Sequence, residues 1–427
     1  MNATNQKRSA EPGRSTLSGE SPLRFSRIRV SFVLALLVVA AGCGDDSSSG
    51  GVEGLAWPTT EWRVEAPEAH EMDASVLDGA RSYAFQDGKN TQGVVVVRNG
   101  VIVGEWYEEG RDENSFATSW SVAKSFTSAL IGIAIHEGLI ESVDVSMSEF
   151  LPEWTGTERE EVTLRDVLSM ASGLKWSESY DPEDLVSSDI IQMILLREDH
   201  LDYAASRPLE FAPGSRWNYS SGDTMLLSGV LEAVTGGNAG SYAREKLFDP
   251  IGMSPVEWWT DATGQTATYC CIDTPARQFA KFGLLYLRGG EWAGTQVVPR
   301  DWVTTSTSPS VVPYYGHQWW LDETPGGREV YSAQGHDGQY IYVVPELDLV
   351  VVRTGHYDKY PGEPRADPSL WSLLPSDGLV EGLGSVPPDR WSDDEFLAPI
   401  EASIGCSSSS RSSGPSTSGS DRGRCTG

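Results

Sequence analysis

Two side chains near residue 120 have the types and the spacing of a serine nucleophile and its base. Ser121 and Lys124 are three residues apart, so on a helix they share a face and the lysine amine can reach the serine hydroxyl. The segment that follows, Ser125–Ile135, is apolar on nearly every face, which predicts a buried central helix. A lysine desolvated at that depth loses affinity for its proton and can act as a base. The pattern therefore predicts nucleophilic catalysis by Ser121, with Lys124 accepting its proton.

The same Ser-x-x-Lys pattern occurs a second time, at Ser172 and Lys175. Gly173 stands inside this second match, and a glycine after a helical segment is typical of a helix C-terminal stop. Lys175 then has no helical reason to face Ser172. We interpret this match as incidental and place the nucleophile at Ser121.

A tyrosine farther along the chain supports this assignment. Among the 15 tyrosines, Tyr219 is the only one followed two residues later by Ser or Asn, here Ser221. It ends a turn that leads into a predicted helix over Ser221–Thr235, with Ser221 as the expected N-cap. The chain has no G-x-S-x-G nucleophile elbow, which excludes an α/β-hydrolase.

The chain resembles the penicillin-binding-protein-like serine hydrolases in two segments, Ser121-Val122-Ala123-Lys124 and Tyr219-Ser220-Ser221. That family includes class C β-lactamases, D-alanyl-D-alanine carboxypeptidases, some esterases and the 6-aminohexanoate-dimer hydrolases. The resemblance implies that Ser121 is acylated, that Lys124 is its proton acceptor, and that Tyr219 relays protons. Class C β-lactamases have Asn where this chain has Ser221, a replacement that resembles the 6-aminohexanoate-dimer hydrolases.

The third motif of the family, Lys-Thr-Gly or His-x-Gly on a strand beside the nucleophile, can be aligned here in two ways. In the alignment that we favour, Ala333-Gln334-Gly335 fills the motif and His336 gives the second oxyanion N–H. In the other, His336-Asp337-Gly338 is itself the motif. Under both, the lysine that holds a substrate carboxylate is missing or is replaced by His336. The resemblance implies that Ser221, Gly335 and His336 contact the substrate. Tyr180 is a further candidate for substrate binding, because related amide hydrolases place a tyrosine in that loop.

The elements around these residues predict an α+β fold. Asn99-Gly100 joins two β-rich runs, residues 93–97 and 101–107, and predicts a hairpin. A second hairpin is predicted near the end of the chain, over residues 340–353. Helices are expected between them over Thr163–Ala171, Ser221–Thr235 and Thr274–Arg288. Strands at both ends with helices between them predict an antiparallel sheet flanked by helices, with an inserted all-helical lobe. The family resemblance implies a β-lactamase/transpeptidase-like arrangement.

The N-terminal residues predict export and a lipid anchor. Three arginines precede a mainly apolar run, residues 30–41, that is too short to cross a bilayer and is typical of a signal peptide. Val39-Ala40-Ala41-Gly42-Cys43 resembles a bacterial lipobox, which implies lipidation of Cys43. The alternative is an ordinary signal peptide with an incidental cysteine. We expect an exported protein that is anchored to a bacterial membrane and faces the periplasm or the cell exterior.

Composition divides the chain into four predicted parts. They are a signal peptide (1–42), a Gly/Ser-rich tether (43–55), the hydrolase domain (56–400) and a disordered Ser-rich tail (401–427). Cys270 and Cys271 are adjacent in the domain, and because a vicinal disulfide strains the backbone we interpret them as buried thiols. Cys406 and Cys425 in the tail could pair after export.

Charge and motif content narrow the expected partners. The chain carries a formal charge of −29, which repels phosphate backbones and disfavours nucleic-acid binding. No Cys/His spacing is typical of zinc, and we expect neither a metal nor a cofactor. The expected partner is a small ester or amide substrate, cleaved through an acyl-enzyme on Ser121. The alternatives are a cell-wall DD-carboxypeptidase or β-lactamase, and a non-catalytic binder of cell-wall peptide, which would have no need for Ser121, Lys124 and Tyr219 together.

Overall fold

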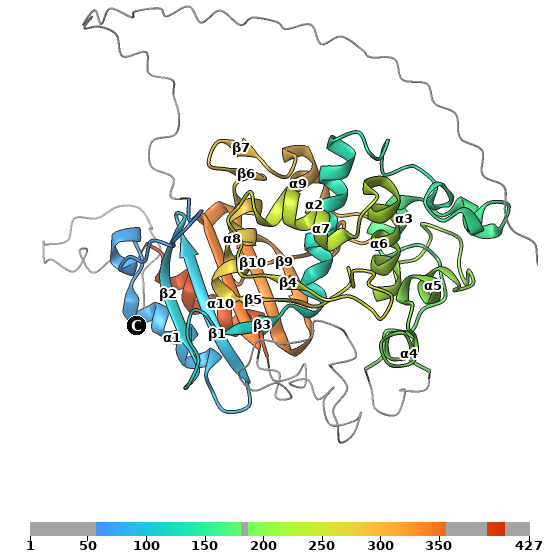
Figure 1. Ribbon diagram of the computed structural model, residues 1–427. Helices are drawn as coiled ribbons and strands as arrows, with labels where there is room; N and C mark the ends of the chain where they lie inside the picture. The colour runs from blue at the N-terminus through green and yellow to red at the C-terminus, as the bar shows by residue number, and fades with distance from the viewer. Residues whose placement is uncertain (1–56, 181–186, 356–390, 406–427) are drawn as a thin grey trace, which may run out of the picture. The chain divides into compact units, whose positions relative to one another are not determined.

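The largest sheet among the described residues has six antiparallel strands, in the order β2-β1-β11-β10-β9-β8 (Figure 1). The structure is a computed structural model, and it describes residues 57–180, 187–355 and 391–405. The strands of this sheet are β1 (Thr91–Arg98), β2 (Val101–Tyr107), β8 (Trp320–Glu323), β9 (Glu329–Gly335), β10 (Gln339–Val344) and β11 (Leu349–Gly355).

Both predicted hairpins are present, and they lie side by side in this sheet. Asn99 and Gly100 have φ values of 53° and 79°, the conformation that a tight hairpin turn between β1 and β2 needs. The C-terminal hairpin joins β10 to β11, and β11 pairs with β1, Val95 lying opposite Val352. The predicted sheet assembled from distant segments is therefore confirmed.

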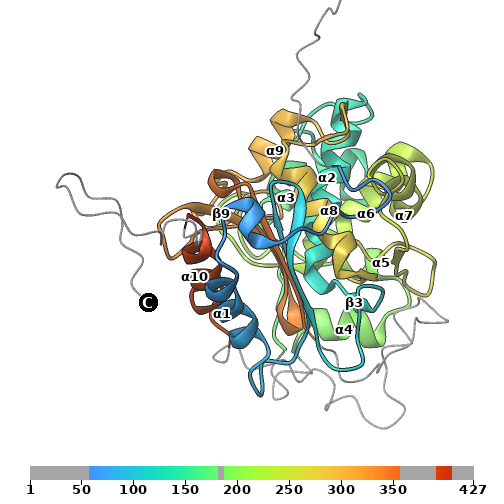
Figure 2. The same ribbon diagram turned by 90° about the vertical axis from the view of Figure 1, so that its left-hand side faces the viewer.

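Alternating side chains of β1 face two separate apolar layers. Val95 and Val97 belong to the large core that also contains Phe126 and Phe282, whereas Val94 and Val96 belong to a smaller one. The helices α1 (Ala74–Ala84) and α10 (Asp393–Ser403) cover the smaller layer, and α8 (Ala276–Leu287) packs on the opposite face (Figure 2). The period of two residues in a strand thus gives a sheet that is buried on both faces.

The inserted helical part lies between β2 and β8 in the chain. Its central helix α2 (Ala123–His136) is buried on nearly every side, as the apolar run predicted. The other helices are α3 (Leu164–Leu168), α4 (Asp189–Leu196), α5 (His200–Ala205), α6 (Ser221–Thr235), α7 (Ala239–Ala243) and α9 (Arg300–Ser306). Short strands accompany them: β3 (Phe116–Thr118), β4 (Glu257–Trp258), β5 (Ile272–Pro275), β6 (Glu291–Trp292) and β7 (Thr295–Gln296). The predicted α+β class, with helices flanking an antiparallel sheet, is confirmed.

The predicted helices differ from the structure mainly at their starts and ends. The helix over Ser221–Thr235 is confirmed, but its N-cap is Ser220, whose hydroxyl accepts the Asp223 N–H. The first predicted helix is shorter and ends at Leu168. The third begins at Ala276 because Thr274 and Pro275 belong to β5, where Thr274 pairs with Ala117. Local sequence favoured helix there, and strand pairing overrode it.

The interpretation of Cys270 and Cys271 as thiols is wrong, although both side chains are buried as expected. The two cysteines form a disulfide with each other. Cys271 has a left-handed φ of 74°, and hydrogen bonds from Trp258 Nε1 and Trp259 N hold the carbonyl groups of Cys270 and Cys271. A strained backbone persists where its surroundings determine it in this way.

Several predictions fall outside the described residues. These are the signal peptide, the tether with Cys43, and the tail cysteines Cys406 and Cys425. Within the described residues, no helix combines the length and the apolar character that a membrane crossing requires. The same part of the chain holds no group of three or more His, Cys, Asp or Glu side chains placed to bind a metal ion.

Candidate active site

Ser121 lies in a single 3₁₀ turn, η2 (Trp120–Val122), that leads directly into α2. Ser119 fastens this turn to β5, because its N–H donates to Ile272 O and its hydroxyl accepts the Ile272 N–H, both at 2.8 Å. Trp120 has a φ of 46°, so the chain turns sharply one residue before the nucleophile. Ser121 is half-buried, whereas the residues after it are fully enclosed. The turn therefore presents one hydroxyl at the edge of the core.

Lys124 stands one turn after Ser121 and is almost completely buried, with 1% of its surface exposed. Its Nζ lies 3.1 Å from Ser121 Oγ. Burial lowers the pKa of the Lys124 amine to about 8, and the Glu178 carboxylate acts in the opposite direction. An amine with this pKa is partly neutral near neutral pH, so it can accept the serine proton.

Two further acceptors surround the Lys124 amine. Ser221 Oγ lies 2.9 Å from Nζ and the Tyr269 carbonyl oxygen lies 2.8 Å from it. Ser221 is the first residue of α6, and Tyr269 precedes the vicinal disulfide. The helix α2, the helix α6 and the turn before β5 therefore meet at one nitrogen atom.

Tyr219 lies beside this pair, at the end of the turn that enters α6. Burial raises the pKa of the Tyr219 phenol, as does the Glu178 carboxylate, while a hydrogen bond with Ser121 lowers it. Lys124 Nζ is 5.1 Å from the centre of the tyrosine ring, and that ring stacks on Trp320 with centroids 5.6 Å apart. A phenol with a raised pKa keeps its proton at neutral pH, so Tyr219 is placed to donate one.

The end of β9 lies against the nucleophile turn. A Cβ atom on Gly335 would be 2.4 Å from Ser119 O and 3.1 Å from Trp120 Cβ, so this close approach requires glycine. The strand β9 ends at Gly335, and the 3₁₀ turn η8 (His336–Gly338) follows it. This placement favours the alignment in which Ala333-Gln334-Gly335 is the third motif on a strand beside the nucleophile.

His336 and Tyr180 also lie together at this end of β9. Their ring centroids are 4.9 Å apart, and His336 Nε2 is 3.7 Å from Asp337 Oδ1. The buried Arg353 donates to the carbonyl groups of Asp337 and Gly338, at 2.9 and 2.6 Å. Its guanidinium therefore holds the η8 turn, a role that the sequence alone did not indicate.

The sequence reasoning also missed Glu178. This carboxylate accepts the Ser221 N–H at 2.9 Å, the Ser221 hydroxyl at 2.5 Å and the Tyr180 hydroxyl at 3.0 Å, and Trp176 Nε1 also donates to it. The sequence spacing could have indicated this contact. Trp176, Glu178 and Tyr180 are two residues apart, and every second side chain of an extended segment points the same way.

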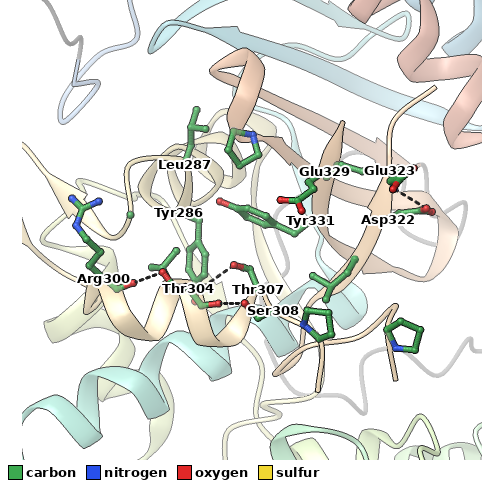
Figure 3. A pocket seen from close by; sticks show the side chains of 17 residues that line it. Tyr286, Leu287, Arg300, Thr304, Thr307, Ser308, Asp322, Glu323, Glu329 and Tyr331 are labelled. Atoms are coloured by element: carbon green, nitrogen blue, oxygen red, sulfur yellow. Dashed lines mark hydrogen bonds between the residues drawn. The ribbon is translucent and has the colours of Figure 1, made fainter. Parts of the chain in front are cut away.

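A cavity of about 710 Å³ lies elsewhere, between α9 and the β8–β9 edge of the sheet. Figure 3 shows Tyr286 of α8, Arg300 and Thr304 of α9 and Tyr331 of β9 in its wall. None of the predicted site residues lines this cavity. It is therefore separate from the serine site.

The fold, with Ser121 and Lys124 side by side, is that of a serine hydrolase. The Beta-lactamase family model matches residues 81–373, and the chain belongs to that family. This membership confirms the predicted class of enzyme.

Individual relatives agree with this assignment. The chain is 26% identical to the 6-aminohexanoate-dimer hydrolase of Paenarthrobacter ureafaciens, over 68% of its own length and 77% of that protein. Among solved structures, the penicillin binding protein from Bacillus halodurans is 19% identical with a TM-score of 0.51, covering 65% of this chain and 94% of that one. EstCE1, a hydrolase with promiscuous acyltransferase activity, is 16% identical with a TM-score of 0.55, covering 66% and 93%. The two structures support the fold.

Proposed function

We propose that this protein cleaves small esters or amides through an acyl-enzyme on Ser121. The observation that carries the proposal is the buried Lys124 amine, 3.1 Å from the Ser121 hydroxyl and with its pKa lowered to about 8. A serine hydroxyl is a weak nucleophile until a base removes its proton, and a desolvated lysine can be that base.

The reaction follows from where the protons can go. Lys124 takes the Ser121 proton as Oγ bonds to the substrate carbonyl carbon. The bond to the leaving group then breaks, Tyr219 gives its proton to the departing oxygen or nitrogen, and the Lys124 ammonium reprotonates Tyr219. In deacylation a water molecule loses its proton by the same route and attacks the acyl carbon, and Ser121 Oγ regains a proton as the ester bond breaks.

The proposed oxyanion site combines two backbone N–H groups. The Ser121 N–H belongs to the nucleophile turn, and the His336 N–H belongs to the turn directly after Gly335. The close approach of Gly335 to Ser119 supports this pairing. Donors aimed at the developing negative charge are commonly among the largest contributions to acyl transfer.

The proposed substrates are uncharged at the position where penicillin-recognising relatives bind a carboxylate. No lysine stands in the third motif, and the guanidinium of Arg353 is engaged with the backbone of the η8 turn. The relative with 26% identity is named for the hydrolysis of the 6-aminohexanoate dimer. We therefore expect turnover of short esters and linear amides, and weak or no turnover of benzylpenicillin.

A substrate panel on one enzyme preparation tests this proposal. The panel contains short p-nitrophenyl esters, linear amides and benzylpenicillin, and kcat/KM is measured for each with Ser121→Ala as the blank. Ester turnover above that of benzylpenicillin supports the assignment. Benzylpenicillin hydrolysis that exceeds ester hydrolysis would instead favour a β-lactamase.

We also infer that the protein is exported and lipid-anchored through Cys43. The support is the apolar run, the small residues before Cys43 and the polar Ser/Gly segment after it. Labelled palmitate should be incorporated in a bacterial host, and Cys43→Ser should abolish the label. Incorporation that Cys43→Ser leaves unchanged would contradict the anchor.

A further inference from the structure

The carboxylate of Glu178 is held at the start of α6 by donors on both of its oxygen atoms. Oε1 accepts the hydroxyl groups of Ser221 and Tyr180, and Oε2 accepts the Ser221 N–H and Trp176 Nε1. Trp176 and Tyr180 belong to the same extended segment as Glu178, and Ser221 is the first residue of α6. A carboxylate bonded in this way is fixed in position and oriented toward Ser221.

This contact determines which way the Ser221 hydroxyl points. A serine hydroxyl has one proton to donate, and an ionised carboxylate can only accept. Since Ser221 gives its proton to Glu178 at 2.5 Å, its oxygen can face Lys124 only as an acceptor. The Tyr269 carbonyl oxygen also lies beside the amine, and it too can only accept a hydrogen bond.

The two acceptors then determine the orientation of the Lys124 amine. A neutral amine has two N–H groups and one lone pair. One N–H goes to Ser221 Oγ at 2.9 Å and the other to Tyr269 O at 2.8 Å. The remaining neighbour is Ser121 Oγ at 3.1 Å, and toward it the amine directs its lone pair.

We propose that Glu178 is a positioning residue of the hydrolase, which acts through Ser221 to direct the lone pair of Lys124 at the Ser121 hydroxyl. Its negative charge also stabilises the Lys124 ammonium that forms when the serine proton is transferred. The inference rests on the proposed function, since it needs Ser121 and Lys124 to be nucleophile and base. It gives Ser221 the role of a link to the base, where the sequence suggested contact with substrate.

Glu178 is the group whose charge acts on Lys124 among the described residues. The phenols of Tyr219 and Tyr269 also face the amine, and burial raises the pKa of both, so they stay neutral at neutral pH. Asp223 lies farther along α6, where its carboxylate accepts the Ser172 hydroxyl. A change at Glu178 should therefore appear in the pH dependence of the base.

The first test is Glu178→Gln in the full-length enzyme, assayed with a short p-nitrophenyl ester. We expect kcat to fall about 10- to 100-fold, as is typical when a partner that orients a metal ligand is removed, with KM nearly unchanged. The acid limb of kcat/KM should also move by about one pH unit to lower pH, because the charge that raises the pKa of Lys124 is gone. Glu232→Gln, which changes an exposed carboxylate on α6, is the matched control and should behave as the parent enzyme.

The second test asks whether Glu178 acts through Ser221. Ser221→Ala should lower kcat to a similar extent, and the double variant should be no worse than the poorer single variant, because both changes break the same link. Losses that multiply in the double variant would overturn the proposal. So would a Glu178→Gln enzyme with parental kcat and an unshifted pH profile.

These outcomes can be separated from failure of the proposed function. If Ser121→Ala and Lys124→Arg are inactive while Glu178→Gln matches the parent, only the role of Glu178 is wrong. If Ser121→Ala retains activity, the proposed function itself is wrong. Should Glu178→Gln fail to fold, Ser221→Thr keeps a hydroxyl and should retain more activity than Ser221→Ala. Equal activity of these two variants would contradict the link.

Discussion

The two Ser-x-x-Lys segments of this chain have the same spacing and opposite environments. Ser121 precedes a buried helix, and Lys124 points back to it from inside the core. The expectation that Gly173 stops the preceding helix is wrong, because that helix ends at Leu168 and the backbone is already left-handed at Met170, with a φ of 58°. Residues 171–180 are not helical, and Lys175 is exposed to solvent. The comparison shows that the spacing brings a buried lysine amine to the serine hydroxyl only where a helix follows the serine and the protein interior encloses the lysine.

The two serine hydroxyls also have different partners. Ser121 Oγ lies against an amine that can accept its proton. Ser172 Oγ donates to the buried carboxylate of Asp223 at 2.7 Å and accepts the Leu174 N–H at 3.2 Å. Burial raises the pKa of Asp223 to about 7, against the hydrogen bonds from Ser172. One serine is available for chemistry and the other stabilises a turn.

The most direct test of the difference between the two segments is to remove each serine hydroxyl in turn. Ser121→Ala should lower kcat for ester hydrolysis by about 10⁴-fold or more, because the attacking oxygen is lost. Ser172→Ala should leave kcat within a few-fold of the parent. A fluorophosphonate probe followed by mass spectrometry should locate the adduct on Ser121, and an adduct on Ser172 would reverse the assignment.

The two lysines offer a matched pair of conservative changes. Lys124→Arg keeps the charge, but a guanidinium stays protonated and cannot accept the serine proton, so the rate should fall about 10²- to 10⁴-fold. Lys175→Arg changes an exposed side chain and should have little effect. Steady-state kinetics on both variants measures these rates. A Lys124→Arg enzyme whose rate is within a few-fold of that of the parent would exclude Lys124 as the base.

The pH profile of the parent enzyme provides a smaller and more specific test. Only the neutral amine of Lys124 can accept a proton, and burial sets its pKa at about 8. The value of kcat/KM should therefore rise with pH, about tenfold per unit below pH 8, and level off above it. The residual activity of Lys124→Arg should lack this limb, and an unchanged limb in that variant would assign it to another group.

The smallest expected effect concerns stability and the second segment. Ser172→Ala removes a hydrogen bond to the buried Asp223, which should lower the free energy of unfolding by about 1–2 kcal/mol. Ser121→Ala should change it much less, because Ser121 is half-buried at the site edge. Urea unfolding of the two variants measures both values. A larger loss for Ser121→Ala would mean that the roles of the two serines are not separate.

Local order in the sequence was enough to predict that Ser121 and Lys124 lie together and to predict the two hairpins. Ser121 and Lys124 are one turn apart on a continuous apolar segment, and Asn99-Gly100 specifies its own turn, so neighbours in the chain carry this information. The spacing of Tyr219 and Ser221 is likewise information carried by neighbours in the chain.

Only the tertiary structure shows which acceptors surround the Lys124 amine. Glu178 meets Ser221 across 43 positions of the chain, and the Tyr269 carbonyl meets Lys124 across 145. No periodicity relates residues at such separations, and a backbone carbonyl has no signature in sequence. The Cys270–Cys271 disulfide follows the same rule, because the left-handed backbone that accommodates it is held by hydrogen bonds to Trp258 and Trp259. Packing brings these groups together, since it selects among long-range contacts that local preferences leave open.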